Sequence, residues 1–395
     1  MSVRALVLID GEHYAPVVRD ALQALPYEVV AALLVGGTEK LREAGADDYG
    51  VPLVAALDDV EVDLVVDLSD EPVLGPSERF LWASRALALG VPYAGADFRF
   101  EPPSFQRVAS PSLAVIGLGK RVGKTAVAGH VARLLGHERR VAVVAMGRGG
   151  PAEPELLEEP PTLDDLLALS RSGRHAASDH FEAAALAGVP AIGCRRAGGG
   201  LAGATFTSNV LDGALLAAQL DPDLLVFDGS GAALPPVETD ARILVTNAGH
   251  DPRAGLNAYR VLISDLVVDT GGSDRDVIRS ISDVPVVAAE LRLRPAEPLG
   301  GRRTAVFTTG PAPTDALDAE IVHVSRNLAR RDALRAELED VDAEVYLVEL
   351  KAAAVDVVAE AAIARGAEVV LAANDVVSTE LDERVLALVP DRSRA

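Results

Sequence analysis

Short apolar runs alternate with amphipathic stretches along almost the whole chain. Over residues 1–98 the apolar runs RALVLID, EVVAALLVG and DLVVDLS are separated by stretches whose apolar positions recur with helical spacing. Apolar runs of about four to eight residues are typical of strands buried on both faces. Strands that alternate with helices in this way predict a parallel α/β unit at the amino-terminal end of the chain.

Two proline-containing stretches interrupt this alternation. RFEPPSFQRVASPS, residues 99–112, and LRLRPAEPLGGRR, residues 291–303, show no periodicity and are expected to link separate units. The central part again alternates strand-like and helical segments, which predicts a mainly parallel sheet covered on both faces. Smaller, Rossmann-like α/β units are expected on either side of it. The predicted domains are residues 1–110, 111–298 and 299–395.

Composition narrows the possible partners. The chain has 395 residues, of which 49% are hydrophobic, and 59 acidic against 37 basic residues leave a formal net charge of -22. This charge argues against nucleic acid or an anionic membrane as a partner, so an anionic substrate needs a local cationic cluster. The single cysteine, Cys194, excludes an internal disulfide. Asp10 lies where a signal peptide would still be apolar, so a cytoplasmic protein is expected.

The stretch GLGKRVGKT carries the clearest chemistry. It follows the apolar run SLAVI and precedes the helical pattern AVAGHVARLL. A strand that delivers a glycine-rich turn to a helix start surrounds an anion with backbone N–H groups. Lys124 is expected to contact the β and γ phosphates of ATP, and Thr125 to hold Mg²⁺. The glycines that allow close approach of the backbone are Gly117, Gly119 and Gly123.

One position departs from the usual phosphate-loop pattern. Leu118 stands where that pattern has its first glycine, and counting from Gly117 gives a loop one residue longer. The longer loop resembles that of the dethiobiotin synthetase and partition-ATPase class. Lys120 and Arg121 within it add two cations, which would neutralise charge on a phosphoryl group in transfer.

A carboxylate that orients the metal is expected at the end of another apolar strand. Asp228 in LLVFDGSG meets this condition, and the glycines after it allow close approach to phosphate. A capping or turn aspartate is the alternative role. Asp269 in DTGG is similar but lies further along the chain and is ranked lower.

Two further stretches carry an excess of positive charge for so acidic a chain. MGRGG follows an expected strand and places Arg148 at the ligand-binding edge of the sheet. Residues 170–209 are rich in arginine, whose fork matches phosphate oxygens bidentately. Surface ion pairs with the many acidic residues are the alternative. The candidates in this stretch for phosphate binding or proton transfer are Arg174, His175, Arg195 and Arg196.

The chain resembles the cyclic 2,3-diphosphoglycerate synthetase family in GLGKRVGKT, MGRGGPAEPE, SGRHAASDHFEAAALAGVPAIGCRRAGGGLAG, FDGSGAALPPV and VELKAAAVDV. The resemblance implies an ATP- and Mg²⁺-dependent ligase that joins the two phosphates of 2,3-diphosphoglycerate as an anhydride. It further implies that Lys124, Thr125 and Asp228 hold Mg-ATP. The migrating and accepting phosphates would be bound by Lys120, Arg121, Arg148, Arg174, Arg195 and Arg196.

Two other functions compete with this one. A carboxylate-activating ligase of the dethiobiotin synthetase type explains the loop but leaves the arginines without a role. Partition-type ATPase switches typically have a second lysine at the position of Gly119. The acidic net charge of this chain also argues against a switch that works on DNA or a membrane. The two end units are expected to cover the central site or to form a homodimer interface.

Overall fold

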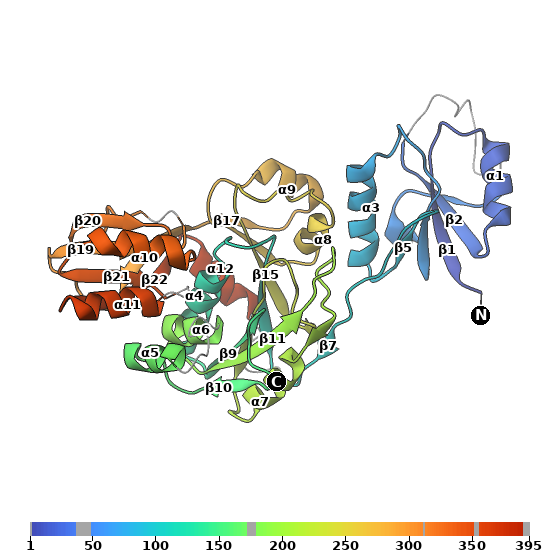
Figure 1. Ribbon diagram of the computed structural model, residues 1–395. Helices are drawn as coiled ribbons and strands as arrows, with labels where there is room; N and C mark the ends of the chain where they lie inside the picture. Colours follow the sequence, from blue (N-terminus) through green and yellow to red (C-terminus); the bar gives the residue numbers. More distant parts are fainter. Residues whose placement is uncertain (1, 37–48, 172–178, 311–312, 351–354, 390–395) are drawn as a thin grey trace.

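The computed structural model describes residues 2–36, 49–171, 179–310, 313–350 and 355–389. Figure 1 shows an N-terminal unit, a central unit and a C-terminal unit, each built around its own sheet. This arrangement confirms the predicted α/β class with a central domain flanked by two smaller ones. None of the helices in the described ranges combines the length and apolar character needed to cross a membrane.

The N-terminal sheet is parallel except at one edge, where β6 runs antiparallel to β5. Its core has two sides, because Leu6 packs on the side of α3 and Val7 on the side of α1. In sheet order the strands are β3 (Leu53–Val54), β2 (Glu28–Leu34), β1 (Arg4–Ile9), β4 (Leu64–Asp67), β5 (Tyr93–Ala94) and β6 (Arg99–Phe100). The helical elements are α1 (Ala15–Ala24), η1 (Leu57–Asp59) and α3 (Pro76–Ala88).

The central sheet carries the phosphate loop in its middle. In sheet order its strands are β10 (Glu155–Leu157), β11 (Ala191–Ala197), β9 (Val141–Gly147), β13 (Leu224–Asp228), β8 (Ser112–Gly117), β15 (Ala241–Thr246), β16 (Leu266–Asp269) and β17 (Val286–Ala288). All run parallel except β10, and β12 (Thr207–Ser208) pairs antiparallel with β11. The helices are α4 (Lys124–Gly136), α5 (Leu163–Arg171), α6 (Asp179–Ala187), α7 (Val210–Ala218), α8 (Asn257–Leu262) and α9 (Arg275–Ile281).

Helices on both faces explain why the central strands are apolar at nearly every position. Val115 of β8 faces α4 and α6, whereas its neighbour Ile116 belongs to the core under α7, α8 and α9. Since successive side chains of a strand point to opposite faces, a strand covered twice needs apolar residues throughout. In parallel sheets of this kind, ligands bind at the edge formed by the carboxyl ends of the strands.

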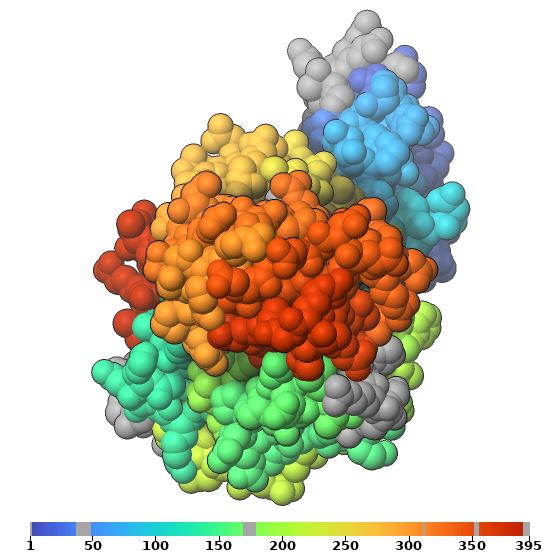
Figure 2. Space-filling view, turned by 60° about the vertical axis from the view of Figure 1, so that its left-hand side comes forward, coloured from blue at the N-terminus to red at the C-terminus, as the bar shows by residue number. Residues whose placement is uncertain are grey.

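The C-terminal sheet has the order β18 (Glu290–Pro295), β22 (Glu368–Val377), β21 (Val345–Glu349), β19 (Arg303–Phe307) and β20 (Glu320–Ser325). Only β18 runs antiparallel to its neighbour. The helices are α10 (Arg331–Asp340), α11 (Val355–Ala364) and α12 (Leu381–Leu388). The last of these leaves the unit, because Leu381 and Val385 are buried in the core beside α4. Figure 2 shows the orange C-terminal unit lying over the green central unit.

The N-terminal and central units also make contact. Helix α3 lies against α8, and Ala83 and Leu87 share one apolar cluster with Tyr259. The stretch between the two units forms β7 (Gln106–Arg107), which pairs with β14 (Val237–Glu238) of the central unit. The connecting stretch is therefore paired with the N-terminal sheet through β6 and with the central unit through β7.

Candidate active site

The phosphate loop begins at the end of β8 and ends where α4 starts. Gly123 precedes the helix with a φ of 89°, in the left-handed region that favours glycine. A Cβ atom there would lie 2.8 Å from Leu291 Cδ1 and 3.3 Å from Thr270 Cγ2. The Thr270 hydroxyl also donates to the Val122 carbonyl at 2.8 Å. Glycine is thus required at this position both by the backbone and by the surrounding side chains.

The other two loop glycines each make room for a particular side chain. A Cβ atom on Gly117 would lie 2.8 Å from Lys124 Cδ and 2.9 Å from Val122 Cγ2. Lys124 is buried and its Nζ donates to the Gly119 carbonyl at 3.0 Å, so its stem runs along the inside of the loop. A Cβ atom on Gly119 would overlap the ring of His250.

The unusual leucine is part of the core. Leu118 is 3% exposed, and its N–H donates to the Val245 carbonyl at 3.2 Å. Beyond it, Lys120 and Arg121 are exposed on the loop. Arg121 has a φ of 61°, which costs a non-glycine residue about 1 kcal/mol. Its carbonyl accepts a hydrogen bond from Asn247 Nδ2 at 3.1 Å, which holds this strained turn.

Asp228 ends β13, the strand that lies between β8 and β9. It pairs in register with Val115 on one side and Ala145 on the other, and its side chain is buried. The phosphate loop and Asp228 therefore leave the sheet at neighbouring strand ends. A carboxylate and the Thr125 hydroxyl are the oxygen ligands that Mg²⁺ prefers. The described residues contain no cluster of three or more His, Cys, Asp or Glu side chains that could hold a metal ion.

The carboxylate of Asp269 accepts hydrogen bonds from the turn that follows it. Its Oδ1 accepts hydrogen bonds from the N–H groups of Gly271 and Ser273 at 3.0 and 3.1 Å, and Arg275 Nε lies 3.7 Å from Oδ2. Because β16 is separated from β8 by β15, Asp269 also lies one strand further from the loop than Asp228 does.

Three cationic side chains from different segments of the central unit converge on Gly231, which has a φ of 63°. A Cβ atom there would lie 3.4 Å from Arg148 Nη2, 3.6 Å from Arg196 Nη2 and 3.8 Å from Lys120 Cγ. We call Lys120, Arg148 and Arg196 the Gly231 cluster. Lys120 belongs to the phosphate loop, Arg148 follows β9, and Arg196 lies near the end of β11. The fold therefore gathers positive charge beside the phosphate loop.

Arg196 is the buried member of the Gly231 cluster, at 8% exposure. Its Nη1 donates to the Gly198 carbonyl at 2.6 Å and its Nη2 to the Ser230 carbonyl at 2.8 Å. The Nε atom is buried and has no hydrogen-bond partner within the described part of the chain. Burial and the charge of Arg148 lower the pKa of Arg196, while Asp179 opposes them. Two like charges held this close favour the binding of an anion.

The remaining predicted residues are placed differently. Arg195 is exposed, and because successive strand residues point to opposite faces, it lies on the other side of β11 from Arg196. Arg174 and His175 lie outside the described residues. The structure therefore brings Lys120, Arg148 and Arg196 together beside the phosphate loop that contains Lys124, and it places Arg195 on the opposite face of β11.

Two residues that the sequence did not single out lie at this edge. Asn247 and His250 follow β15, the strand next to β8, and contact the phosphate loop. Burial and the charge of Lys124 lower the pKa of His250. The signal that could have found both was the position of TNAGH at the carboxyl end of an apolar strand.

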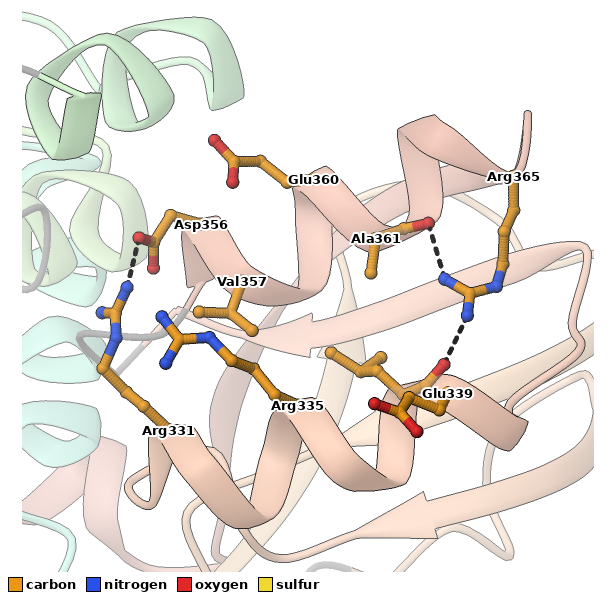
Figure 3. A pocket seen from close by; sticks show the side chains of 9 residues that line it. Arg331, Arg335, Glu339, Asp356, Val357, Glu360, Ala361 and Arg365 are labelled. Carbon is orange, nitrogen blue, oxygen red and sulfur yellow. Dashed lines mark hydrogen bonds and ion pairs between the residues drawn. The ribbon is translucent and has the colours of Figure 1, made fainter.

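A groove in the C-terminal unit also contains arginines. It has a volume of about 310 Å³ and lies between α10 and α11 (Figure 3). Arg331 Nη2 pairs with Asp356 Oδ2 at 2.6 Å, and Arg365 donates to the carbonyls of Ala361 and Leu338. As many carboxylates as arginines line this groove, whereas three cations and no carboxylate are the side chains nearest to Gly231. The excess of positive charge beside the phosphate loop therefore lies in the central unit.

A strand, glycine-rich loop and helix that surround a buried lysine, with a buried aspartate at the neighbouring strand end, define a P-loop nucleotide-binding protein. Family models identify the particular group. The N-terminal, P-loop and C-terminal domains of cyclic 2,3-diphosphoglycerate synthetase match residues 4–101, 112–284 and 295–375. The chain belongs to the cyclic 2,3-diphosphoglycerate synthetase family, which confirms the resemblance noted in the sequence.

Relatives of the same name support this assignment. The cyclic 2,3-diphosphoglycerate synthetase of Rubrobacter xylanophilus is 48% identical over 98% of this chain and 97% of its own. That of Thermococcus gammatolerans is 43% identical over 97% of this chain and 96% of its own. Among solved structures, LpxK from Aquifex aeolicus in complex with ATP has a TM-score of 0.44 and 15% identity, covering 73% of this chain and 91% of LpxK.

Proposed function

We propose that the protein uses ATP to convert 2,3-diphosphoglycerate into its cyclic anhydride, with release of ADP and phosphate. The observation that carries the proposal is the Gly231 cluster beside the phosphate loop, because three converging cations favour an anionic acceptor next to the triphosphate. The family membership and the name shared by the relatives support the choice of substrate. A carboxylate-activating ligase would need no such cluster.

The nucleotide is held by the loop and its neighbours. Lys124 neutralises the β and γ phosphates, and the backbone N–H groups at the start of α4 contact them. Mg²⁺, when bound by Thr125 and Asp228, would supply positive charge to the γ phosphate and fix its orientation. No protein nucleophile is needed, because the acceptor oxygen belongs to the substrate.

The reaction has two steps. In the first, an oxygen of one substrate phosphate attacks the γ phosphorus, and the bond between that phosphorus and the β-phosphate oxygen breaks to release ADP. In the second, an oxygen of the other substrate phosphate attacks the inner phosphorus of the new anhydride, and inorganic phosphate leaves. Both steps bring together groups of like charge, which the Gly231 cluster would neutralise. The second step is intramolecular, so little further entropy is lost.

Phosphorus NMR of a reaction with ATP, Mg²⁺ and 2,3-diphosphoglycerate tests the proposal. A new anhydride signal should grow in step with ADP and inorganic phosphate. A substrate with one phosphate, such as 3-phosphoglycerate, should give no ring product and serves as the control. ATP turnover that needs no phosphorylated acceptor, or an acceptor consumed without a cyclic product, would show the substrate assignment to be wrong.

A further inference from the structure

The imidazole of His250 packs against Gly119 of the phosphate loop. A Cβ atom on Gly119 would overlap its ring, and the nearest ring atom is Nε2. The φ angle of Gly119 is outside the left-handed region, so the backbone does not require glycine there. Glycine at position 119 instead allows the imidazole to approach the loop.

Asn247 determines which ring nitrogen of His250 carries the hydrogen. Its Nδ2 donates to the Arg121 carbonyl at 3.1 Å, and its Oδ1 accepts from the N–H of Gly249 at 3.1 Å. These two bonds set the orientation of the amide. The oxygen therefore faces His250 Nδ1, 3.0 Å away, and that nitrogen must carry a hydrogen. The nitrogen directed at the loop is Nε2.

Lys124 shows which part of ATP this nitrogen would meet. A phosphate-loop lysine contacts the β and γ phosphates, and Lys124 Nζ is hydrogen-bonded to the carbonyl of Gly119. The imidazole packs on the same glycine, so Nε2 lies at the end of the site that takes the outer phosphates. This placement rests on the proposed use of ATP.

We propose that His250 is a ligand of the outer phosphates of ATP through Nε2, and that Asn247 is its positioning residue. Because Nδ1 already carries a hydrogen, Nε2 can donate to a phosphate oxygen only when the ring is an imidazolium. Binding of a triphosphate therefore takes up a proton at this ring. The cation that acts on the ring is Lys124 of α4. On the loop, Lys120 and Arg121 are exposed, and Lys120 lies near Gly231.

Proton uptake can be measured on the unmutated protein. Titration calorimetry with a non-hydrolysable ATP analogue, repeated at pH 7.5 in buffers of different ionisation heat, gives the number of protons bound. We expect an uptake of about one half to one proton. ADP and AMP, which have fewer outer phosphates, should give progressively smaller uptake.

Two substitutions separate a phosphate ligand from a structural role. The side-chain amide of His250→Gln reaches the place of Nε2, whereas that of His250→Asn reaches only the place of Nδ1. We expect His250→Asn to weaken binding of the analogue roughly 10- to 100-fold, and His250→Gln to lose less affinity while showing no proton uptake. His137→Gln, at the exposed end of α4, is the matched control and should leave both quantities unchanged.

The outcomes of these measurements distinguish a failure of the role of His250 from a failure of the proposed use of ATP. Unmutated protein that fails to bind the analogue would overturn both this inference and the proposed use of ATP. Binding without proton uptake, or an asparagine variant that binds as tightly as the glutamine variant, would overturn the role of His250 and leave ATP use intact. Thermal melting of the variants with ADP absent checks that both are folded.

Discussion

Replacing Arg196 by lysine keeps the positive charge but removes the guanidinium fork. The two terminal nitrogens of Arg196 bind the carbonyls of Gly198 and Ser230, and its Nε is the buried nitrogen without a partner within the described residues. One ammonium group cannot reach two carbonyls on different loops and a phosphate as well. The variant therefore loses contacts to the substrate, to the protein or to both.

The expected size of the effect follows from these contacts. A hydrogen bond to a charged group contributes about 1.5–3 kcal/mol, which corresponds to roughly 10- to 150-fold in rate or affinity. We expect kcat/KM for 2,3-diphosphoglycerate to fall by roughly 10- to 100-fold. Leaving one buried carbonyl without its donor costs about 1–3 kcal/mol of unfolding free energy, so Tm should fall by several degrees. ATP affinity should change by less than about threefold, because Lys124 and the phosphate loop are untouched.

Steady-state release of ADP at varied concentrations of 2,3-diphosphoglycerate measures the effect, and titration with an ATP analogue measures nucleotide binding. Arg195→Lys is the comparison, because Arg195 precedes Arg196 in β11 but is exposed on the other face. Its expected cost is less than about threefold. The reasoning is refuted if Arg195→Lys is as damaging as Arg196→Lys, or if Arg196→Lys weakens ATP binding while the kinetics with the acceptor stay the same.

Three further predictions test the site and its surroundings. Gly119→Ala should weaken nucleotide binding by tenfold or more in calorimetry, since the added methyl overlaps His250, whereas Gly310→Ala, with nothing within 4 Å, should have no effect. Asp228→Asn should lower turnover by about 100-fold and raise the Mg²⁺ concentration needed for half-maximal rate. Burial and Asp212 raise the pKa of Cys194 from 9.0 to about 12, so at pH 8 a thiol reagent should modify the native protein about a thousandfold more slowly than the unfolded chain; comparable rates would contradict its burial.

The phosphate loop could be predicted because its signal is local. The order of apolar run, glycine-rich turn and helical pattern lies within one short stretch, and each part has a physical reason to occur beside the others. Leu118 is the exception. The sequence pointed to a lengthened loop, and the structure adds that this leucine is a buried core residue whose N–H is bonded to β15.

Contacts between distant segments could not be predicted in the same way. Residues 291–303 were expected to link two units, yet the first of them belong to β18, which pairs with β22 some eighty residues later in the chain. The apolar pattern of one strand does not identify its partner. Arg195 and Arg196 illustrate a second cause. Both were expected to bind phosphate, but they lie next to each other in β11, which runs to Ala197, and successive side chains of a strand point to opposite faces.

The C-terminal unit shapes the nucleotide site through side chains that reach the phosphate loop. Leu291 of β18 lies against Gly123, the residue that precedes α4. Asp375 of β22 pairs with Arg133 of α4 at 3.2 Å. Asp382 of α12 is hydrogen-bonded to His130 on the same helix at 2.7 Å. Since two elements of one unit contact α4 of another and a third contacts the glycine before it, we expect the position of α4 to depend on the C-terminal unit being folded. The phosphate loop at its start should share that dependence.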